Sequence, residues 1–241
     1  MSSKIHILKS ELANKIAAGE VVQRPAAAVK ELVENSLDAK ATAISVIIRD
    51  AGKSMIQVVD DGEGMSGEDV LMAFKRHATS KISTSDDLEN IRTLGFRGEA
   101  LASIGSIAQV EMKSRTAGED VGTLVRVEGD EIKETSKTAL ERGTSVCVRN
   151  LFYNTPARRN FLKSNQTERK NITDVVTRTA FAYPEVAWSY VSDDDVILDL
   201  RPKSFEERVR DIVGSKQFDQ LVRVEESTDY LSLHGFVGRP D

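Results

Sequence analysis

The sequence predicts an α+β fold: a sandwich of β-strands and helices, followed by the start of a second, smaller α/β domain. Segments rich in β-branched residues occur in adjacent runs, and helical patterns lie between the runs instead of after every strand. The chain of 241 residues, 40% of them hydrophobic, is long enough for one large domain and a smaller piece. These observations favour a sheet-and-helix sandwich over alternating βαβ units.

Helical and extended patterns follow one another in a definite order. We expect helices over residues 9–23, 25–38, 66–76, 99–108, 155–181 and 204–213, and strands over 41–50, 55–60, 107–114, 121–127, 131–136, 144–150, 186–192 and 196–200, with further strands before 238. The first helix carries an interruption at Gly19. Pro25 suits the first turn of the second helix, where N–H groups are unpaired anyway. Ser66 followed by Asp69 resembles a capping box, and Thr155 is the expected cap of the long helix.

Two further features divide the chain. Residues 78–98 are rich in Ser, Thr and Gly and contain only one short amphipathic piece. A connection this long inside a compact domain indicates either a wrong assignment or a functional lid. After Pro202 the pattern changes, so we place a boundary there. Residues 1–202 are expected to form the first domain, and residues 203–241 the beginning of the second.

Composition limits the class of protein. The net charge of −5 argues against a general polyanion binder, although local basic clusters can still touch nucleic acid. A single cysteine, Cys147, rules out an internal disulfide and suits a reducing compartment. No apolar run is long enough to cross a bilayer, and the N-terminus lacks a signal-peptide pattern. We expect a soluble protein without membrane contact, cytoplasmic in a bacterium or nuclear in a eukaryote, with the bacterial case favoured.

A glycine-rich loop follows the strand that ends at Asp60. The sequence DDGEGMSG contains Gly62-x-Gly64-x-x-Gly67, the spacing of a dinucleotide fingerprint. Acidic residues around these glycines would repel a pyrophosphate, and the strand belongs to a hairpin, so we reject that interpretation. The Asp60 carboxylate could instead accept a hydrogen bond from the amino group of adenine, while the glycines let a flat ligand lie against the backbone. An ordinary Asp/Gly turn also explains this loop and is the commoner case.

A second glycine-bearing segment is suited to phosphate groups. The chain contains no G-x-x-x-x-G-K-[ST] sequence, which excludes the P-loop NTPases. In GFRGEAL (95–101), two glycines precede a helix, whose unpaired N–H groups and dipole attract phosphate oxygens. Arg97 adds a positive charge, and Thr79 and Lys81 stand upstream in the same segment. An ordinary glycine-containing loop is the alternative, but these signals together favour phosphate contact.

The second helix carries a polar stripe opposite an apolar one, formed by Glu31, Glu34, Asn35 and Asp38. Mg²⁺ prefers oxygen ligands and leans on nucleotide phosphates, so the side-chain carbonyl of Asn35 would suffice as its protein ligand. Glu31, one turn earlier, is placed to activate a water that attacks a γ-phosphate. Glu34 and Asp38 receive supporting roles, as hydrogen-bond acceptors for neighbouring loops or as solvated groups. Spacing alone also fits a solvated helix face, which is the commoner case.

Four segments together resemble the motifs of the GHKL ATPases: KELVENSLDA (30–39), DDGEGM (60–65), RHATSKI (76–82) and GFRGEAL (95–101). Within that superfamily, KIAAGEVVQRPAAAVKELVENSLDA, GFRGEALASI and LFYNTPARRNFL (151–162) resemble the MutL family of DNA mismatch-repair proteins. The similarity covers nearly the whole chain, and GFRGEAL is highly specific to that family. The resemblance implies the Bergerat fold, a mixed sheet with helices on one face and ATP between the helices and a lid.

The resemblance also implies roles for individual residues. It implies Glu31 as the catalytic general base, Asn35 as the Mg²⁺ ligand and Asp60 as the adenine contact. Together with the residues argued above, the expected cofactor-binding set is Asn35, Asp60, Gly64, Thr79, Lys81, Phe96, Arg97, Gly98, Glu99, Ala100, Leu101 and Thr144. The loop DDGEGM departs from the family's commoner DNGCGM at Asp61 and Glu63, but the first aspartate and both motif glycines remain.

Other properties of the family enter as expectations. A lysine of the second domain completes the family's ATP site, and this sequence stops early in that domain. We therefore expect an N-terminal piece whose Mg²⁺-dependent ATP hydrolysis is weak until that lysine is supplied. The resemblance further implies an ATP-dependent homodimer in the full-length protein, a MutS-type mismatch-recognition partner, and weak, non-specific contact with DNA. Residues 1–23 are expected to reach toward the dimer partner. A basic side of one helix could touch DNA phosphates or be merely solvated: Arg158, Arg159, Lys163, Arg169 and Lys170.

Two functions from different classes remain open at this point. One is an ATPase switch that links mismatch recognition to downstream repair enzymes. The other is a nucleotide-gated clamp for DNA or a partner, in which hydrolysis is incidental. Dimerisation with a non-hydrolysable analogue separates them, because a pure binding module would behave normally with Glu31→Ala. A histidine kinase is set aside, because the three histidines are not placed on an obvious acceptor helix.

Overall fold

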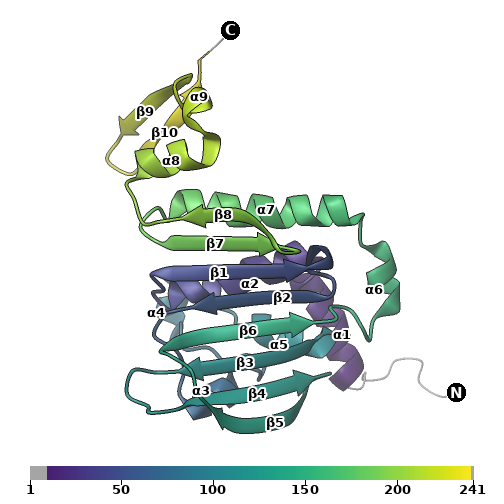
Figure 1. Cartoon of the computed structure of the whole chain (residues 1–241). Coiled ribbons are helices and arrows are strands. Elements are labelled where there is room, and N and C mark those ends of the chain that lie inside the picture. The colour runs from purple at the N-terminus through teal and green to yellow at the C-terminus, as the bar shows by residue number, and fades with distance from the viewer. Residues whose placement is uncertain (1–9, 240–241) are drawn as a thin grey trace, which may run out of the picture.

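The computed structural model describes residues 10–239, and a large mixed sheet forms its centre. The strands are β1 (Ala43–Arg49), β2 (Met55–Asp60), β3 (Gln109–Arg115), β4 (Gly122–Glu128), β5 (Glu131–Thr138), β6 (Gly143–Arg149), β7 (Ala187–Ser192), β8 (Asp195–Leu200), β9 (Leu221–Ser227) and β10 (Ser232–Gly238). The helices are α1 (Ser10–Val21), α2 (Pro25–Asp38), α3 (Gly67–Met72), α4 (Ser85–Glu89), α5 (Ala100–Ile107), α6 (Pro156–Phe161), α7 (Asn165–Ala182), α8 (Phe205–Val213) and α9 (Ser215–Phe218), and a 3-10 turn, η1 (Asp50–Gly52), joins β1 to β2. Most of these elements follow the predicted order (Figure 1).

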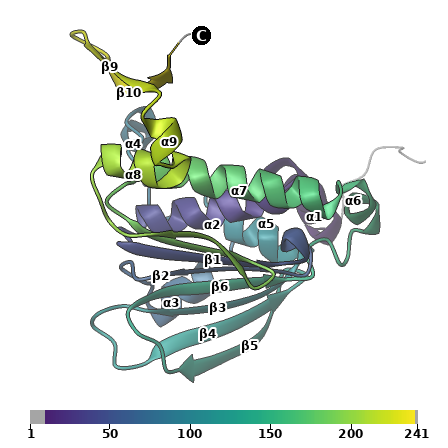
Figure 2. The ribbon, with the colours of Figure 1, turned by 45° about the horizontal axis from the view of Figure 1, so that its top comes forward.

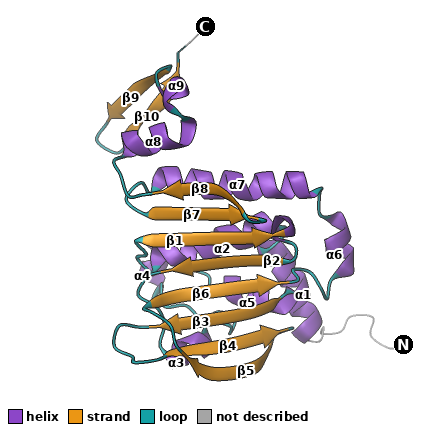
Figure 3. Cartoon of the chain, in the orientation of Figure 1, coloured by secondary structure: helices purple, strands orange, loops and turns teal. Residues whose placement is uncertain are grey.

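Eight strands form one sheet in the order β5-β4-β3-β6-β2-β1-β7-β8 (Figure 3). Neighbouring strands are antiparallel except β1 and β7, which run parallel. The sheet is therefore mixed, which confirms the predicted fold class. The register of β2 places Asp60, the last residue of that strand, opposite Thr144 of β6.

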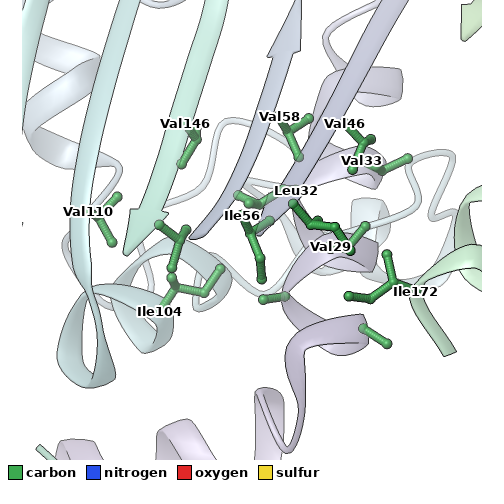
Figure 4. Packing of buried hydrophobic residues seen from close by; sticks show 14 of the residues in the cluster. Val29, Leu32, Val33, Val46, Ile56, Val58, Ile104, Val110, Val146 and Ile172 are labelled. Carbon is green, nitrogen blue, oxygen red and sulfur yellow. The ribbon is translucent and has the colours of Figure 1, made fainter. Parts of the chain in front are cut away.

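Helices α2, α5 and α7 cover one face of this sheet (Figure 2). Between the two layers lies the core, where Leu32 of α2, Ile104 of α5 and Ile172 of α7 meet sheet residues such as Ile56 and Val110 (Figure 4). Each of these five residues is at most 2% exposed. Burying one such aliphatic side chain stabilises a fold by about 1.5–3 kcal/mol, so this layer contact holds α2 firmly against the sheet.

Helix α1 differs from its prediction, because it continues through Gly19 without interruption. The lack of a side chain at Gly19 leaves room for a residue of another helix. A Cβ atom at Gly19 would lie 1.9 Å from Nη2 of Arg158, and the same nitrogen donates to the carbonyl of Ile16 at 3.4 Å. Glycine thus lets the side chain of α6 lie across α1. Residue 9 of the predicted helix, and residues 1–9 of the arm expected to reach a dimer partner, lie outside the described residues.

The helix predicted from Ser66 begins as expected but ends at Met72 instead of near Arg76. The Ser66 hydroxyl accepts the N–H of Asp69 at 3.2 Å. In a full capping box the Asp69 carboxylate would accept the backbone N–H of Ser66, whereas here it accepts the Ser66 hydroxyl. The chain then turns, with a positive φ of 60° at His77. Arg76 donates to the carbonyl of Asn14 in α1 at 3.1 Å, a tertiary contact that helical periodicity does not report.

The single long helix predicted over 155–181 is wrong, because two helices occupy this region. Leu162 is extended (φ −62°, ψ 143°) and ends α6. Ser164 then caps α7 by accepting the N–H of Thr167 at 3.3 Å. Thr155, the predicted cap, makes no such hydrogen bond. A serine cap inside an apparently helical pattern divides it, because a capping side chain competes with the continuing backbone ladder.

The chain beyond β8 forms a separate small unit. Phe205 of α8 and Phe218 of α9 pack against Phe236 of β10. The two-stranded sheet β9–β10 shares no strand with the eight-stranded sheet and protrudes beyond it (Figure 1). The boundary placed near residue 202 agrees with this arrangement and stays a prediction. Among residues 10–239, no helix combines the length and the apolar character that crossing a bilayer requires.

Candidate functional site

A cavity of about 1310 Å³ lies between α2, the lid (residues 78–98), the start of α5, and strands β2, β3 and β6. Its lining brings together all of the residues that the sequence predicted for catalysis and cofactor binding: Glu31, Asn35, Asp60, Gly64, Thr79, Lys81, Phe96, Arg97, Gly98, Glu99, Ala100, Leu101 and Thr144. These positions are widely spaced in the sequence. The lid assignment explains the long, Ser- and Thr-rich connection, because that connection closes one side of the cavity.

Helix α2 presents its polar stripe to this cavity. The opposite stripe is held in the core, where Val29 and Val33 are fully buried. The acids on the polar side are shielded as well: the side chain of Glu31 is 29% exposed and that of Asp38 only 8%. A plainly solvated helix face, the commoner reading of such spacing, is therefore wrong for this helix.

Glu31 lies in a surrounding that disfavours its charge. Burial raises the pKa of its carboxyl above the usual value, while the charges of Lys30, Lys81 and Arg97 act in the opposite direction. The Nζ atom of Lys30 is 4.0 Å from the carboxylate, too far for a hydrogen bond. A raised pKa and lone pairs turned toward a cavity are properties of a general base.

Asp60 is held by two donors at the end of β2. One oxygen accepts the hydroxyl of Ser36 at 2.7 Å and the other accepts the N–H of Gly62 at 3.0 Å. Burial raises the pKa of this carboxyl, against the effect of these hydrogen bonds. A carboxylate has about four acceptor sites, so the fixed group can still accept a hydrogen bond from a ligand in the cavity.

Ser36 is a site residue that the sequence analysis did not identify. It is 3% exposed and ties helix α2 to Asp60, so it fixes the orientation of that carboxylate. The available signal was a hydroxyl residue within an otherwise apolar helical stripe. The cavity is also lined by Ala17, Glu20 and Val21 of α1, a contribution that no local pattern indicated.

The glycines near Asp60 are also needed for the packing of the chain itself. Gly64 has a φ of 70°, and a Cβ atom there would lie 2.1 Å from the carbonyl oxygen of Arg115. A Cβ at Gly143 would lie 2.0 Å from the carbonyl oxygen of Asp60. The chain itself fills the space beside these residues, so glycine permits close backbone packing. Approach of a flat ligand is not required to explain them.

The lid folds back on itself beside α5. Gly98 has a φ of 61°, and a Cβ atom there would lie 2.4 Å from the carbonyl oxygen of Ala78. The lid's first and last residues therefore cross at this point. Near the crossing, the hydroxyl of Thr79 accepts the N–H of Lys81 at 3.1 Å, and the guanidinium of Arg97 lies 5.5 Å from the ring of Phe96. Thr79 and Arg97 thus stand beside this crossing, and the first turn of α5 follows it along the chain.

The side chains that line the cavity can hold a hard divalent cation only together with a bound ligand that supplies further oxygen atoms. Within residues 10–239, no three His, Cys, Asp or Glu side chains gather as a metal-binding group. The side-chain oxygen of Asn35 faces the cavity and currently accepts the ammonium of Lys81 at 2.9 Å. A single neutral oxygen of this kind suits Mg²⁺, which takes most of its remaining ligands from water and phosphate.

The predicted basic helix side is divided between two helices and the turn between them. Arg158 lies against α1 and is not free. Its companions Arg159, Lys163, Arg169 and Lys170 are exposed. The basic surface therefore exists in a reduced form, and it does not belong to one helix.

Comparison with known proteins shows which family this chain resembles. The sequence signature of the histidine kinase-, DNA gyrase B- and HSP90-like ATPases matches residues 23–151. The chain is 51% identical over 241 residues to a DNA mismatch repair protein MutL of Christiangramia forsetii, and 51% identical over 237 residues to one of Prosthecochloris aestuarii. It spans 39% and 38% of the length of these two relatives.

Solved structures of related domains also resemble this chain. The Aquifex aeolicus MutL ATPase domain complexed with ADP matches with a TM-score of 0.70 and 33% identity, over 92% of this chain and 79% of that one. The N-terminal domain of a DNA repair protein matches with a TM-score of 0.77 and 26% identity, over 93% and 70% of the two chains. The sequence and fold comparisons therefore agree.

Proposed function

Because the chain belongs to the histidine kinase-, DNA gyrase B- and HSP90-like ATPases, and among them to the MutL ATPase domains, we propose that it binds ATP with Mg²⁺ and hydrolyses it as a switch in DNA mismatch repair. The observation that carries this proposal is the convergence of Glu31, Asn35 and Asp60 on one cavity. A general base, a metal ligand and a purine-reading acid are the protein groups that such a reaction needs.

Adenine selection is assigned to Asp60. Its carboxylate is fixed by Ser36 and Gly62 and would accept a hydrogen bond from the amino group of adenine. A guanine base carries a carbonyl oxygen at that position, which cannot donate. Thr144, paired with Asp60 across β2 and β6, forms the wall behind the base.

The phosphate end is assigned to the lid and to α5. Thr79, Lys81 and Arg97 supply donors and positive charge, and the first turn of α5 supplies unpaired N–H groups. Bound Mg²⁺ would supply charge neutralisation at the phosphates, with Asn35 as its protein ligand. Glu31 would orient the attacking water and take its proton.

Further properties of the whole protein are part of the same proposal. Residues 203–241 belong to a second domain in this proposal. The full-length protein forms an ATP-dependent homodimer, works with a MutS-type recognition protein and contacts DNA weakly without sequence preference. We place it in the cytoplasm of a bacterium, in keeping with the bacterial relatives.

Calorimetric titration with ATP tests the pocket assignment. Asp60→Asn should lower the affinity roughly tenfold or more, because an amide that replaces the fixed carboxylate turns a donor toward the adenine amine. Asn35→Ala should weaken binding more in Mg²⁺ than in EDTA, because only the former includes the loss of the metal ligand. Asp193→Asn is the matched control, since Asp193 lies outside the cavity and accepts the N–H of Asp50. Unchanged ATP affinity in both site variants would refute the assignment.

A further inference from the structure

Asp38, whose role the sequence left open, makes more contacts with the lid than its position on α2 suggests. One carboxylate oxygen accepts the N–H of Leu94 at 2.9 Å. The other accepts the N–H of Gly95 at 3.2 Å and the ammonium of Lys81 at 2.5 Å. Lys81 stands near the start of the lid, and Leu94 and Gly95 stand near its end. A single carboxylate on the helix therefore fastens both ends of the lid.

The same contact fixes where Lys81 points. Its ammonium also donates to the side-chain oxygen of Asn35 at 2.9 Å. The two acceptors lie on one helical face, and the side chain of Lys81 is only 20% exposed. An ammonium held between two acceptors on a rigid helix has few alternative positions, whereas a free lysine has many rotamers to lose. The positive charge is therefore held in place at the cavity wall.

The partners of Asp38 explain how an acidic side chain can line a cavity that binds a polyanion. Glu34 pairs with Lys30 at 2.8 Å, outside the lid contacts. Asp38 is neutralised by Lys81 and by two backbone N–H groups. Hydrogen bonds to a charged group are roughly twice as strong as neutral ones, and mostly buried ones are screened little by salt. Asp38 thus presents no bare negative charge to incoming phosphates.

We propose that Asp38 is a positioning residue, which holds the lid closed against α2 and aims Lys81 at the phosphate end of the cavity. This inference rests on the proposed nucleotide function and deepens it. Asp38 itself need not touch the nucleotide: it acts through Lys81 and through the backbone of residues 94–95. Asparagine cannot replace it, because one amide oxygen cannot accept from both N–H groups and the ammonium, and its NH₂ group would oppose a donor.

Hydrogen–deuterium exchange without nucleotide tests the anchoring step. Asp38→Asn should speed exchange at the amides of Leu94 and Gly95 roughly tenfold or more, because a single amide oxygen cannot replace the two carboxylate oxygens that accept them. Lys81→Met should leave these two amides nearly unchanged, since both still have the carboxylate. Asp193→Asn serves as the matched control for an aspartate that accepts a backbone N–H elsewhere. Equal exchange at both amides in the wild type and in Asp38→Asn would overturn the proposal.

Calorimetry with ATP and with adenosine tests the aiming step. Asp38→Asn and Lys81→Met should each lower ATP affinity roughly tenfold and leave adenosine affinity within about twofold, because the base is held elsewhere. Lys81→Arg should recover part of the ATP affinity. An equal loss for ATP and adenosine would mean general damage to the pocket and would overturn the proposal, as would no loss for ATP.

The proposed nucleotide function and the proposed role of Asp38 can be refuted separately. If the wild type bound no ATP, the nucleotide function would fall, while the exchange experiment would still decide whether Asp38 anchors the lid. Thermal unfolding of every variant identifies any failure to fold. Lys81→Met leaves α2 unaltered, so the aiming step remains testable even if Asp38→Asn is unstable.

Discussion

Glu31 and Asp60 are two carboxyl groups on one cavity, and burial raises the pKa of both. Their neighbours prepare them for different tasks. Both oxygens of Asp60 are held by donors, so its geometry is fixed and its role is recognition. Lys30 lies 4.0 Å from the Glu31 carboxylate, beyond hydrogen-bond range, so that group keeps lone pairs for a water. The chemical difference lies in the partners and not in the type of side chain.

Glu31→Ala should reduce ATP hydrolysis by about 10²–10⁴-fold and leave ATP affinity nearly unchanged, because a general base contributes to the transition state and not to binding. The pH profile of the wild type should report the same group. Since burial favours the protonated form, the carboxylate takes up its proton at a higher pH than an ordinary glutamate does. The rate should therefore fall with decreasing pH at a midpoint above the usual glutamate pKa.

Steady-state phosphate release at saturating Mg²⁺ and ATP measures both effects, with calorimetry for affinity. Asp193→Asn again provides the control. Hydrolysis by Glu31→Ala at the wild-type rate would assign the activity to another group or to a contaminant.

The lid is an element whose shape depends on close backbone contacts. It contains one short helix, α4, and is held at its ends by Asp38 and by the crossing of Gly98 with Ala78. A left-handed backbone costs an L-residue about 1–2 kcal/mol, and a Cβ at Gly98 would also press on a backbone carbonyl at 2.4 Å. Only glycine satisfies both conditions at this crossing.

Gly98→Ala should weaken ATP binding roughly tenfold, because strain of about 1–2 kcal/mol opens the lid from the cavity end. Gly118→Ala is the matched control, since a Cβ there meets nothing within 4 Å. Calorimetry with ATP measures the loss, and the melting temperature shows that the core is intact. Equal ATP affinity in the two variants would mean that the lid crossing is not needed for binding.

At the scale of the whole molecule, the small C-terminal unit is joined to the sheet by a buried arginine. Arg208 of α8 is fully buried, and its Nη2 donates to the carbonyls of Pro184, Val186 and Arg201 at 2.8–2.9 Å. Burial lowers the pKa of this guanidinium, which nevertheless stays charged because arginine titrates far above neutral pH. These acceptors belong to the loop before β7 and the end of β8, so one side chain connects the two units.

Arg208→Met should lower the free energy of unfolding by about 1.5–3 kcal/mol, the usual worth of hydrogen bonds to a charged group. It should also speed tryptic cleavage after Lys203, because the junction loosens. Arg210→Met is the control on the same helix, where the guanidinium is exposed and lies over Phe218 within the small unit. Urea unfolding and timed proteolysis report the two effects. Wild-type cleavage rates in Arg208→Met would show that other contacts hold the junction.

The sequence by itself determined the features that depend on local pattern. The stripe containing Glu31 and Asn35, the strand ending at Asp60 and the segment GFRGEAL were each visible without coordinates. Helical and strand periodicities report which side of an element is buried, and specific motifs carry the family's chemistry. The α+β arrangement followed from these periodicities, and the family, with the mixed sheet and the site residues that it implies, followed from the motifs. The helix predicted over 155–181 shows the limit of periodicity, because a cap at Ser164 divides it.

Only the tertiary structure decided which distant groups meet. It paired β1 with β7 in parallel, placed Ser36 on Asp60, and fastened both lid ends to Asp38. It also gave Gly64 a role in chain packing, because a Cβ atom there would lie 2.1 Å from the carbonyl oxygen of Arg115. The physical reason is that side-chain periodicity describes an element's own faces, whereas hydrogen-bond partners across the fold depend on how those elements are brought together in space.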